Sequence, residues 1–405
     1  MSRLWILSLA SKNIRARPFR NAILVAAVAA VAGMQVSGAL LERASRRSLE
    51  LGIRRLGADL VAVPFGADEA LTRSYLTGDA ATFYMDRSVR EKIAGFPFVA
   101  QTSSQLFLKS LSNAGCCSLW NIYLVGFEPE SDFAIRPWLA DHPERPLGTD
   151  EALVGAAIGV EPGGALKFFG HDFRVAGTLS KTGMGLDSAV FIPLETAYLM
   201  AKESASKAQK ALEISPDRIS AVLIKLKPEG KGGLPAYKAA FELEKALPEI
   251  SMVQPDDLAV KTRNNLSAAL AGLRSAGYVI WPVTAALIAL VFALAANERK
   301  RELGIMRSVG ASRGFVFRMI IMEALIITAM GAVLGLLVSI GIILGFSGLI
   351  AARLSIPFLA PPVSELFLLA AAALILAMLT GAVAAFFPAF KAARMAPAEA
   401  RKQGE

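Results

Sequence analysis

The chain has 405 residues, of which 54% are hydrophobic, and its mean hydropathy is positive at +0.48, a composition that a soluble protein of this length would struggle to keep in solution. The formal net charge is +9, yet residues 43–275 contain 27 basic and 27 acidic side chains, so the positive excess lies in the segments that flank the apolar runs. This distribution is typical of a membrane protein and argues against nucleic acid as a partner.

The first 42 residues predict a surface helix followed by a membrane span. Residues 1–20 mix five basic side chains with apolar ones, a pattern typical of an amphipathic helix on the cytoplasmic surface of the bilayer. In residues 21–42 the run Asn21–Leu41 carries no charge, and as a helix it would be about 32 Å long, enough to cross. A cleaved signal peptide is the alternative, which the length of the run and the spans that follow disfavour.

The region 43–276 is expected to form a large domain outside the cytoplasm. Residues 42–56 keep helical spacing and residues 256–274 are compatible with a helix, so both are predicted to be stalks that continue the first and second spans. The other interpretation of residues 42–56 is a solvent-facing helix with no mechanical role. Between them an α+β domain is predicted, with strands at 60–63, 105–111, 122–127, 173–176, 189–192 and 221–226 and helices at 87–94, 194–211 and 234–246.

Three further spans are predicted at 277–297, 315–349 and 365–390. They are separated by a basic segment at 298–314 and a short outer loop at 350–364, and a tail follows at 391–405. Basic residues number six in 297–318 and four in the tail but one in the outer loop, so both termini are expected in the cytoplasm. In the third span Gly331 and Gly335 are four residues apart, a small-xxx-small pattern that permits close packing of helices. The alternative is that these glycines simply face lipid.

The segment 298–314 contains the sequence ERKRELGIMRSVGAS from Glu298 to Ser312. After the charged cluster, Leu303, Met306 and Val309 recur at the three-residue step that places side chains on one face of a helix. The pattern predicts a short amphipathic helix in water at the membrane surface, held between two spans. By itself it leaves two interpretations, a helix that receives a push from a soluble partner and a basic loop that only sets topology.

This stretch resembles the cytoplasmic loop of the FtsX/MacB family of ABC-transporter permeases. Three other segments resemble the pattern of the same family: GADLVAVP (57–64), GLDSAVFIPL (185–194) and FPAFKAARMAPA (387–398). The resemblance implies four transmembrane helices with a MacB-like extracytoplasmic α+β domain between the first two, in a multi-pass protein of the cell inner membrane. It also implies a separate ABC ATPase, a homo- or heterodimer of permeases, and ATPase coupling through Glu298, Arg301, Glu302, Leu303, Met306 and Arg307.

The function expected from the resemblance is that of a permease. It would couple ATP hydrolysis on another subunit to movement of the outer domain, for export or extraction of a substrate. The sequence contains no match to G-x-x-x-x-G-K-[ST], so ATP is expected on the partner, the chain is not expected to be an enzyme, and no cofactor is expected. The alternative is a mechanotransmitter that transports nothing and regulates an extracytoplasmic partner.

The only two cysteines, Cys116 and Cys117, are adjacent and are expected outside the cytoplasm. Three interpretations stay open: a vicinal disulfide, a pair of soft ligands or exchanging thiols, and inert packing. The second would make the chain a permease for a soft metal or a thiol-containing substrate. The only two histidines, His142 and His171, occur in polar turns and are predicted to be exposed to solvent.

Overall fold

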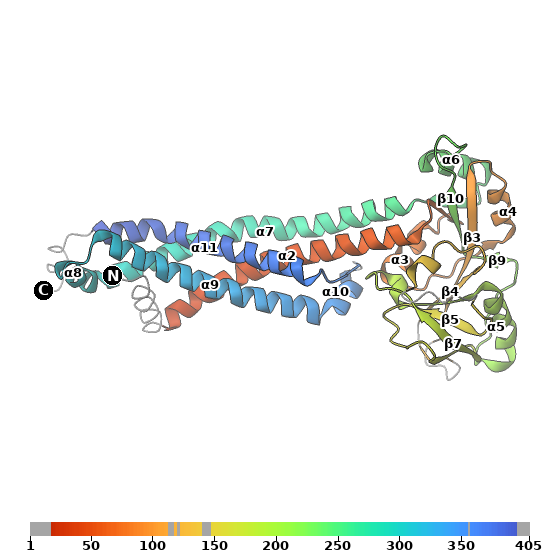
Figure 1. Cartoon of the computed structure of the whole chain (residues 1–405), viewed down its shortest axis with the longest axis horizontal. Coiled ribbons are helices and arrows are strands. Elements are labelled where there is room, and N and C mark those ends of the chain that lie inside the picture. The colour runs from red at the N-terminus through yellow and green to blue at the C-terminus, as the bar shows by residue number, and fades with distance from the viewer. Residues whose placement is uncertain (1–17, 112–116, 120–121, 140–146, 355–356, 395–405) are drawn as a thin grey trace. The chain divides into compact units, whose positions relative to one another are not determined.

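The computed structural model describes residues 18–111, 117–119, 122–139, 147–354 and 357–394 (Figure 1). The predicted surface helix at 1–20 therefore lies outside the described residues up to residue 17. The chain divides into two compact units. Unit 1 consists of Met1–Arg43, Ser267–Ser347 and Ala360–Glu405, and unit 2 of Ala44–Leu266 and Gly348–Leu359.

Unit 1 is helical. Four of its helices are long and apolar enough to cross a membrane, over Pro18–Gly52, Ser275–Glu298, Arg313–Gly345 and Val363–Arg394. The predicted set of four membrane helices is thus present in the described chain. The helices of unit 1 are α2 (Pro18–Leu56) and α7 (Pro255–Glu298), which both continue into unit 2, and α8 (Lys300–Ser308), α9 (Arg313–Gly345) and α11 (Val363–Arg394).

Helices α2 and α9 pack closely through the glycines of α9. A Cβ atom on Gly331 would lie 2.7 Å from the Cβ of Val28, and one on Gly335 would lie 2.3 Å from the carbonyl oxygen of Ala29. Both distances are too short for a side chain, so the backbones could not approach this closely with any larger residue. The predicted small-xxx-small contact is confirmed, and the hydroxyls of Ser37 and Ser339 hydrogen bond across the same pair of helices at 2.7 Å.

Helix α7 contains a proline in its interior. Pro282 has no N–H to donate to the carbonyl one turn earlier, so one hydrogen bond of the helix is missing there. The neighbouring Trp281 donates from its indole Nε1 to the hydroxyl of Thr380 on α11 at 3.1 Å. Thr380 in turn donates to the carbonyl of Leu376 at 2.8 Å. The weakened turn of α7 is therefore tied to α11.

Unit 2 contains a nine-stranded mixed sheet in the order β11-β1-β10-β3-β4-β8-β5-β7-β6, and β2 pairs with β9 separately. Two pairs are parallel, β4 with β8 and β5 with β7, and the other pairs are antiparallel. The strands are β1 (Leu60–Pro64), β2 (Met85–Asp86), β3 (Val99–Lys109), β4 (Tyr123–Phe127), β5 (Glu151–Val154), β6 (Ala165–Phe168), β7 (His171–Thr178), β8 (Ala189–Pro193), β9 (Arg218–Ile219), β10 (Ala221–Leu226) and β11 (Ile250–Val253).

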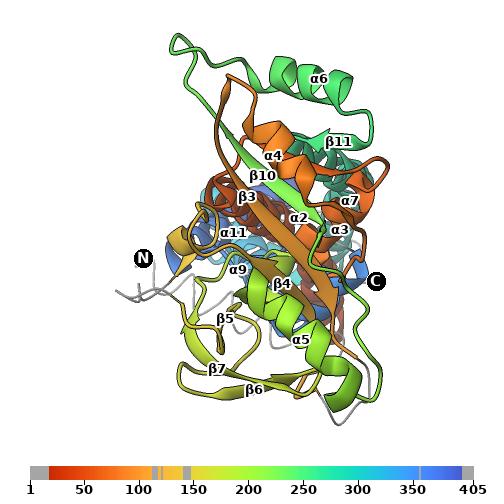
Figure 2. The same cartoon turned by 90° about the vertical axis from the view of Figure 1, so that its right-hand side faces the viewer.

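The sheet has a hydrophobic core on each face. Alternate residues of β3 point to opposite sides, so Leu106 and Leu108 enter one core and Phe107 enters the other. On the first face lie α4 (Ser88–Ala94), α5 (Leu194–Lys207) and α6 (Ala236–Ala246), with α4 and α5 visible across the strands in Figure 2. The second face is covered by α3 (Asp68–Thr77) and by two short 3-10 helices, η1 (Arg136–Trp138) and η2 (Gly185–Ser188).

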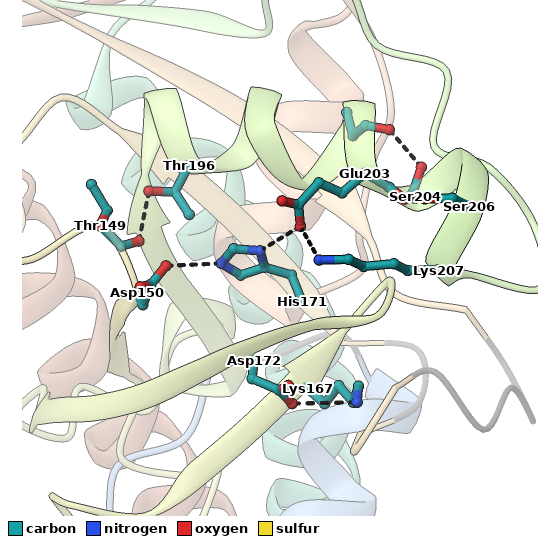
Figure 3. Close-up of polar contacts among 11 residues, drawn as sticks. Thr149, Asp150, Lys167, His171, Asp172, Thr196, Glu203, Ser204, Ser206 and Lys207 are labelled. Carbon is teal, nitrogen blue, oxygen red and sulfur yellow. Dashed lines mark hydrogen bonds and ion pairs between the residues drawn. The ribbon is translucent and has the colours of Figure 1, made fainter.

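His171 is buried, so the prediction that it is exposed to solvent is wrong. Only 8% of it is accessible, and its ring contacts a carboxylate on each side. Nδ1 lies 3.1 Å from Oε2 of Glu203 on α5, and Nε2 lies 3.2 Å from Oδ1 of Asp150, just before β5 (Figure 3). The prediction used only the polar residues next to His171 in the sequence. The ring is covered by α5, whose Glu203 lies 32 residues further along the chain. His142 lies outside the described residues.

The Glu203 carboxylate is predicted to make the stability of unit 2 depend on pH. Its pKa is lowered by the hydrogen bond from Lys207 and, next, by the hydrogen bond with His171. Because the folded-state pKa is below the unfolded-state pKa, this contribution to stability is present above the unfolded value and is lost as the pH falls through the folded value. We expect Glu203→Gln to destabilise the chain at pH 7, and we expect its difference from the wild type to shrink as the pH falls below the ordinary range of a glutamate.

The measurement is thermal unfolding of the purified full-length chain between pH 7 and pH 3. The control is Glu213→Gln, which removes an exposed carboxylate with no hydrogen bond or ion pair among the described residues. A gap between Glu203→Gln and the wild type that stays constant over this range would contradict the assignment.

Candidate coupling site

Helix α8 is almost continuous with α7 and turns sharply into α9. The amide of Arg299 donates to the carbonyl of Ala295, and the carbonyl of Arg299 accepts from Leu303, so helical hydrogen bonding passes through the junction. At the other end Gly310 has a φ of 102°, a conformation that favours glycine. Ser312 then caps α9 by accepting a hydrogen bond from the amide of Phe315 at 3.2 Å.

The inner face of α8 packs against the other helices of unit 1. Leu303 is 3% exposed and shares a core with Val316 and Met319 of α9 and with Ala392 and Ala393 of α11, and Met306 packs against the same core. Arg307, in the last turn, donates from Nη1 to the carbonyl of Ala393 at 3.3 Å. The inner face of α8 is therefore in contact with both α9 and α11.

A buried ion pair lies beside this core, at the junction of α7 and α8. The Nη1 atom of Arg299 is 3.2 Å and 3.4 Å from the two carboxylate oxygens of Glu323 on α9, and both residues are buried. Neither side chain could be left alone at this site, because an unpaired buried charge is strongly unfavourable. Glu298 makes a longer contact of 3.5 Å with Arg20, near the start of α2.

Residues 274–397, which contain α8, α9, α11 and the apolar part of α7, match the family model described as the FtsX-like permease C-terminal domain. This part of the chain is an FtsX-like permease domain. A similar protein is the macrolide export ATP-binding/permease protein MacB of Nitrobacter winogradskyi, at 27% identity over 234 residues. Another is the pyoverdine export ATP-binding/permease protein PvdT of Pseudomonas syringae pv. syringae, at 27% identity over 150 residues.

These similarities cover only part of each relative. The alignments take in 56% and 37% of this chain, but 32% of MacB and 20% of PvdT, so the chain spans a third or less of these curated relatives. Among solved structures, the periplasmic region of MacB from Actinobacillus actinomycetemcomitans is aligned over 52% of this chain and 96% of that one, at 13% identity and a TM-score of 0.36.

The FtsX-like domain presents a second face of α8 to solvent. Glu302 is exposed, Ile305 is 56% exposed and Val309, just past the end of the helix, is 84% exposed. Glu302 lies in the first turn and Arg307 in the last, an arrangement that the helix dipole favours. Ile305 on α8 and Val309 just beyond its end thus place two apolar side chains in solvent near each other in the sequence.

The predicted coupling residues thus have different surroundings in the FtsX-like domain. Leu303, Met306 and Arg307 face the helix bundle, Glu302 faces solvent, Glu298 ends α7, and Arg301 lies on α8. The grouping of Val309 with Leu303 and Met306 on one face does not hold, because α8 ends at Ser308. Neither Ile305 nor the Arg299–Glu323 pair was predicted from the sequence; the indication that the sequence offered is the charged cluster that precedes an apolar run.

The cysteine pair is described only in part. Cys117 is buried in the core of the sheet face that carries α5, and Cys116 lies outside the described residues. The next residue, Ser118, exchanges two hydrogen bonds with Lys167 of β6, at 2.7 Å and 2.8 Å. Among the described residues no group of three or more His, Cys, Asp or Glu side chains is placed to hold a metal ion. A disulfide or a metal at this pair stays a prediction.

Proposed function

We propose that this chain is the membrane subunit of an ABC transporter and that its ATPase docks on the solvent-facing side of α8. The observation that carries the proposal is the division of α8 into two faces. One face is fixed to the bundle by Leu303 and Arg307, and the other exposes Ile305, with the exposed Val309 just beyond the end of the helix. A rigid helix with an apolar outer face can receive a partner and pass its movement on.

The movement has a continuous path through the chain. Helix α7 joins α8 through Arg299 and is unbroken from Pro255 to Glu298, and α8 joins α9 through a four-residue turn. We propose that nucleotide binding outside these 405 residues displaces α8, and that α7 and α9 transmit this displacement toward unit 2, on the other side of the bilayer. The similarity to export permeases supports movement of a substrate away from the cell.

The proposed unit is a dimer of permeases with two ATPase subunits. A symmetric dimer would present two copies of α8 to two copies of the ATPase. The relatives are named as combined ATP-binding and permease proteins, which supports an ATPase as the partner.

The test combines topology with ATPase association. In intact spheroplasts a membrane-impermeant maleimide should label a cysteine at Tyr237→Cys, a 62% exposed position on α6, and should not label Val309→Cys until the membrane is permeabilised. Peptide mass spectrometry distinguishes these sites from the native cysteines. The purified chain should also retain a nucleotide-hydrolysing subunit. Labelling of both positions from one side, or purification without such a subunit, would refute the proposal.

A further inference from the structure

The loop at residues 181–188, between β7 and β8, is organised around one buried carboxylate. Asp187 accepts from the amide and the hydroxyl of Thr182, at 2.9 Å and 2.7 Å, and from the amide of Gly183 at 2.6 Å. Asp187 is itself 5% exposed. Charged acceptors make strong hydrogen bonds to backbone amides, so this side chain stabilises the turn at residues 182–183.

This loop contacts the part of α2 that belongs to unit 2. The hydroxyl of Ser48, which is fully buried, donates to the carbonyl of Thr182 at 2.8 Å. One turn further along α2, a Cβ atom on Gly52 would lie 1.6 Å from the sulfur of Met184. The Met184 side chain therefore lies directly on Gly52 and would have to move if position 52 carried a larger residue.

The same loop contacts the segment that precedes α11. The amide of Phe358 donates to the carbonyl of Gly183 at 3.1 Å, and the amide of Leu359 to the carbonyl of Ala44 on α2 at 3.4 Å. Gly183 has a φ of 77°, and a Cβ there would lie 2.4 Å from the carbonyl oxygen of Phe358. Position 183 therefore requires glycine both for its backbone conformation and for space.

The loop leads directly into the middle of the sheet. Its last four residues form η2, and β8 begins at the next residue, between β4 and β5. The carbonyl of Asp187 accepts from Ala157 at 2.9 Å, and Gly185 packs against Gly78 at the end of α3. Three parts of unit 2 that are far apart in sequence thus meet on eight residues: α2, the segment 357–359 and the sheet.

We infer that the 181–188 loop, held by Asp187 as its positioning residue, is the joint through which movement of α2 and of the segment before α11 reaches the sheet of unit 2. The source of that movement rests on the proposed function. Contacts with no room for a Cβ atom do not slide, so the joint stays closed and moves as one piece. Helix displacement then shifts β8, and β8 carries α5, which follows it directly.

The joint is tested first without nucleotide, in the full-length chain in lipid nanodiscs. A Cβ at position 52 lies 2.9 Å from the Cγ of Met184, which suits a disulfide, so Gly52→Cys with Met184→Cys should cross-link. Adding Asp187→Asn should slow the cross-link, and should speed amide exchange at Phe358 and Leu359, by roughly tenfold. The control Asp172→Asn, at an exposed carboxylate of β7, should change neither. Equal rates with and without Asp187→Asn would overturn the inference.

The second measurement adds the ATPase and a non-hydrolysable ATP analogue. In the wild type, amide exchange should change in α8 and also in β8 and α5. In Asp187→Asn the change in α8 should remain and the change in β8 and α5 should be lost, whereas the cross-linked joint should keep both. A response of β8 and α5 that survives Asp187→Asn would refute the joint. An α8 that never responds would count against ATPase docking, and the joint would still be judged by the measurements without nucleotide.

Discussion

Replacing Arg299 by alanine is expected to destabilise the chain by about 3–5 kcal/mol, because it leaves the buried carboxylate of Glu323 without its guanidinium. The pair joins the α7–α8 junction to α9, so the loss should also loosen α8. The free energy of unfolding of the purified chain in detergent is measured by denaturant titration.

Two further variants separate the pair from general effects of substitution. The double variant Arg299→Met with Glu323→Leu removes both charges and keeps the volume apolar, so it should recover most of the lost stability, to within about 1–2 kcal/mol of the wild type. Arg318→Ala, at an exposed position of α9, should change stability by less than about 0.5 kcal/mol. If the double variant is no more stable than Arg299→Ala, the pair is not the cause of the effect.

Ile305→Asp is expected to weaken binding of the ATPase by about 30- to 1000-fold, the effect of placing a charge in the apolar centre of an interface. Ile305 is more than half exposed, so the substitution should leave folding of the chain intact. Binding is measured with the purified ATPase and the chain in nanodiscs, together with stimulation of ATP hydrolysis. Val309→Asp should act in the same direction.

The matched control is Ser308→Asp, which adds the same charge at an exposed position of the same helix without removing apolar surface. It should weaken binding only a few-fold. Met306→Ala should instead lower stability, because its side chain packs against the bundle core. ATPase binding that is unaffected by Ile305→Asp, or equally affected by Ser308→Asp, would place the docking surface elsewhere.

The membrane helices could be predicted because each needs a long run without charge, which is visible in the sequence itself. The strands of the sheet were harder to predict from the sequence. The predicted strands at 60–63, 122–127, 189–192 and 221–226 correspond to β1, β4, β8 and β10, but β5, β6 and β11 were missed. Each of these three is short, at four residues, and forms because a neighbouring strand is available.

Contacts between distant residues set the limit in the candidate site as well. A charged cluster before an apolar run predicts a surface helix, but it does not say that Arg299 will meet a carboxylate 24 residues away on α9. The three-residue step predicts one apolar face, yet the helix ends before Val309 and leaves that side chain in solvent. His171 was misjudged for the same reason, because α5 covers it only once the sheet has formed.

Pro282 gives α7 an uneven bending stiffness. A 44-residue helix would otherwise behave as one rod, but a rod with a missing hydrogen bond flexes at that point and absorbs part of any push applied at its end. The Trp281–Thr380 hydrogen bond holds this flexible turn of α7 against α11. A push on α7 is then transmitted efficiently only when α7 and α11 tilt together. If α7 tilted alone, the helix would bend at Pro282 and its far end would move less.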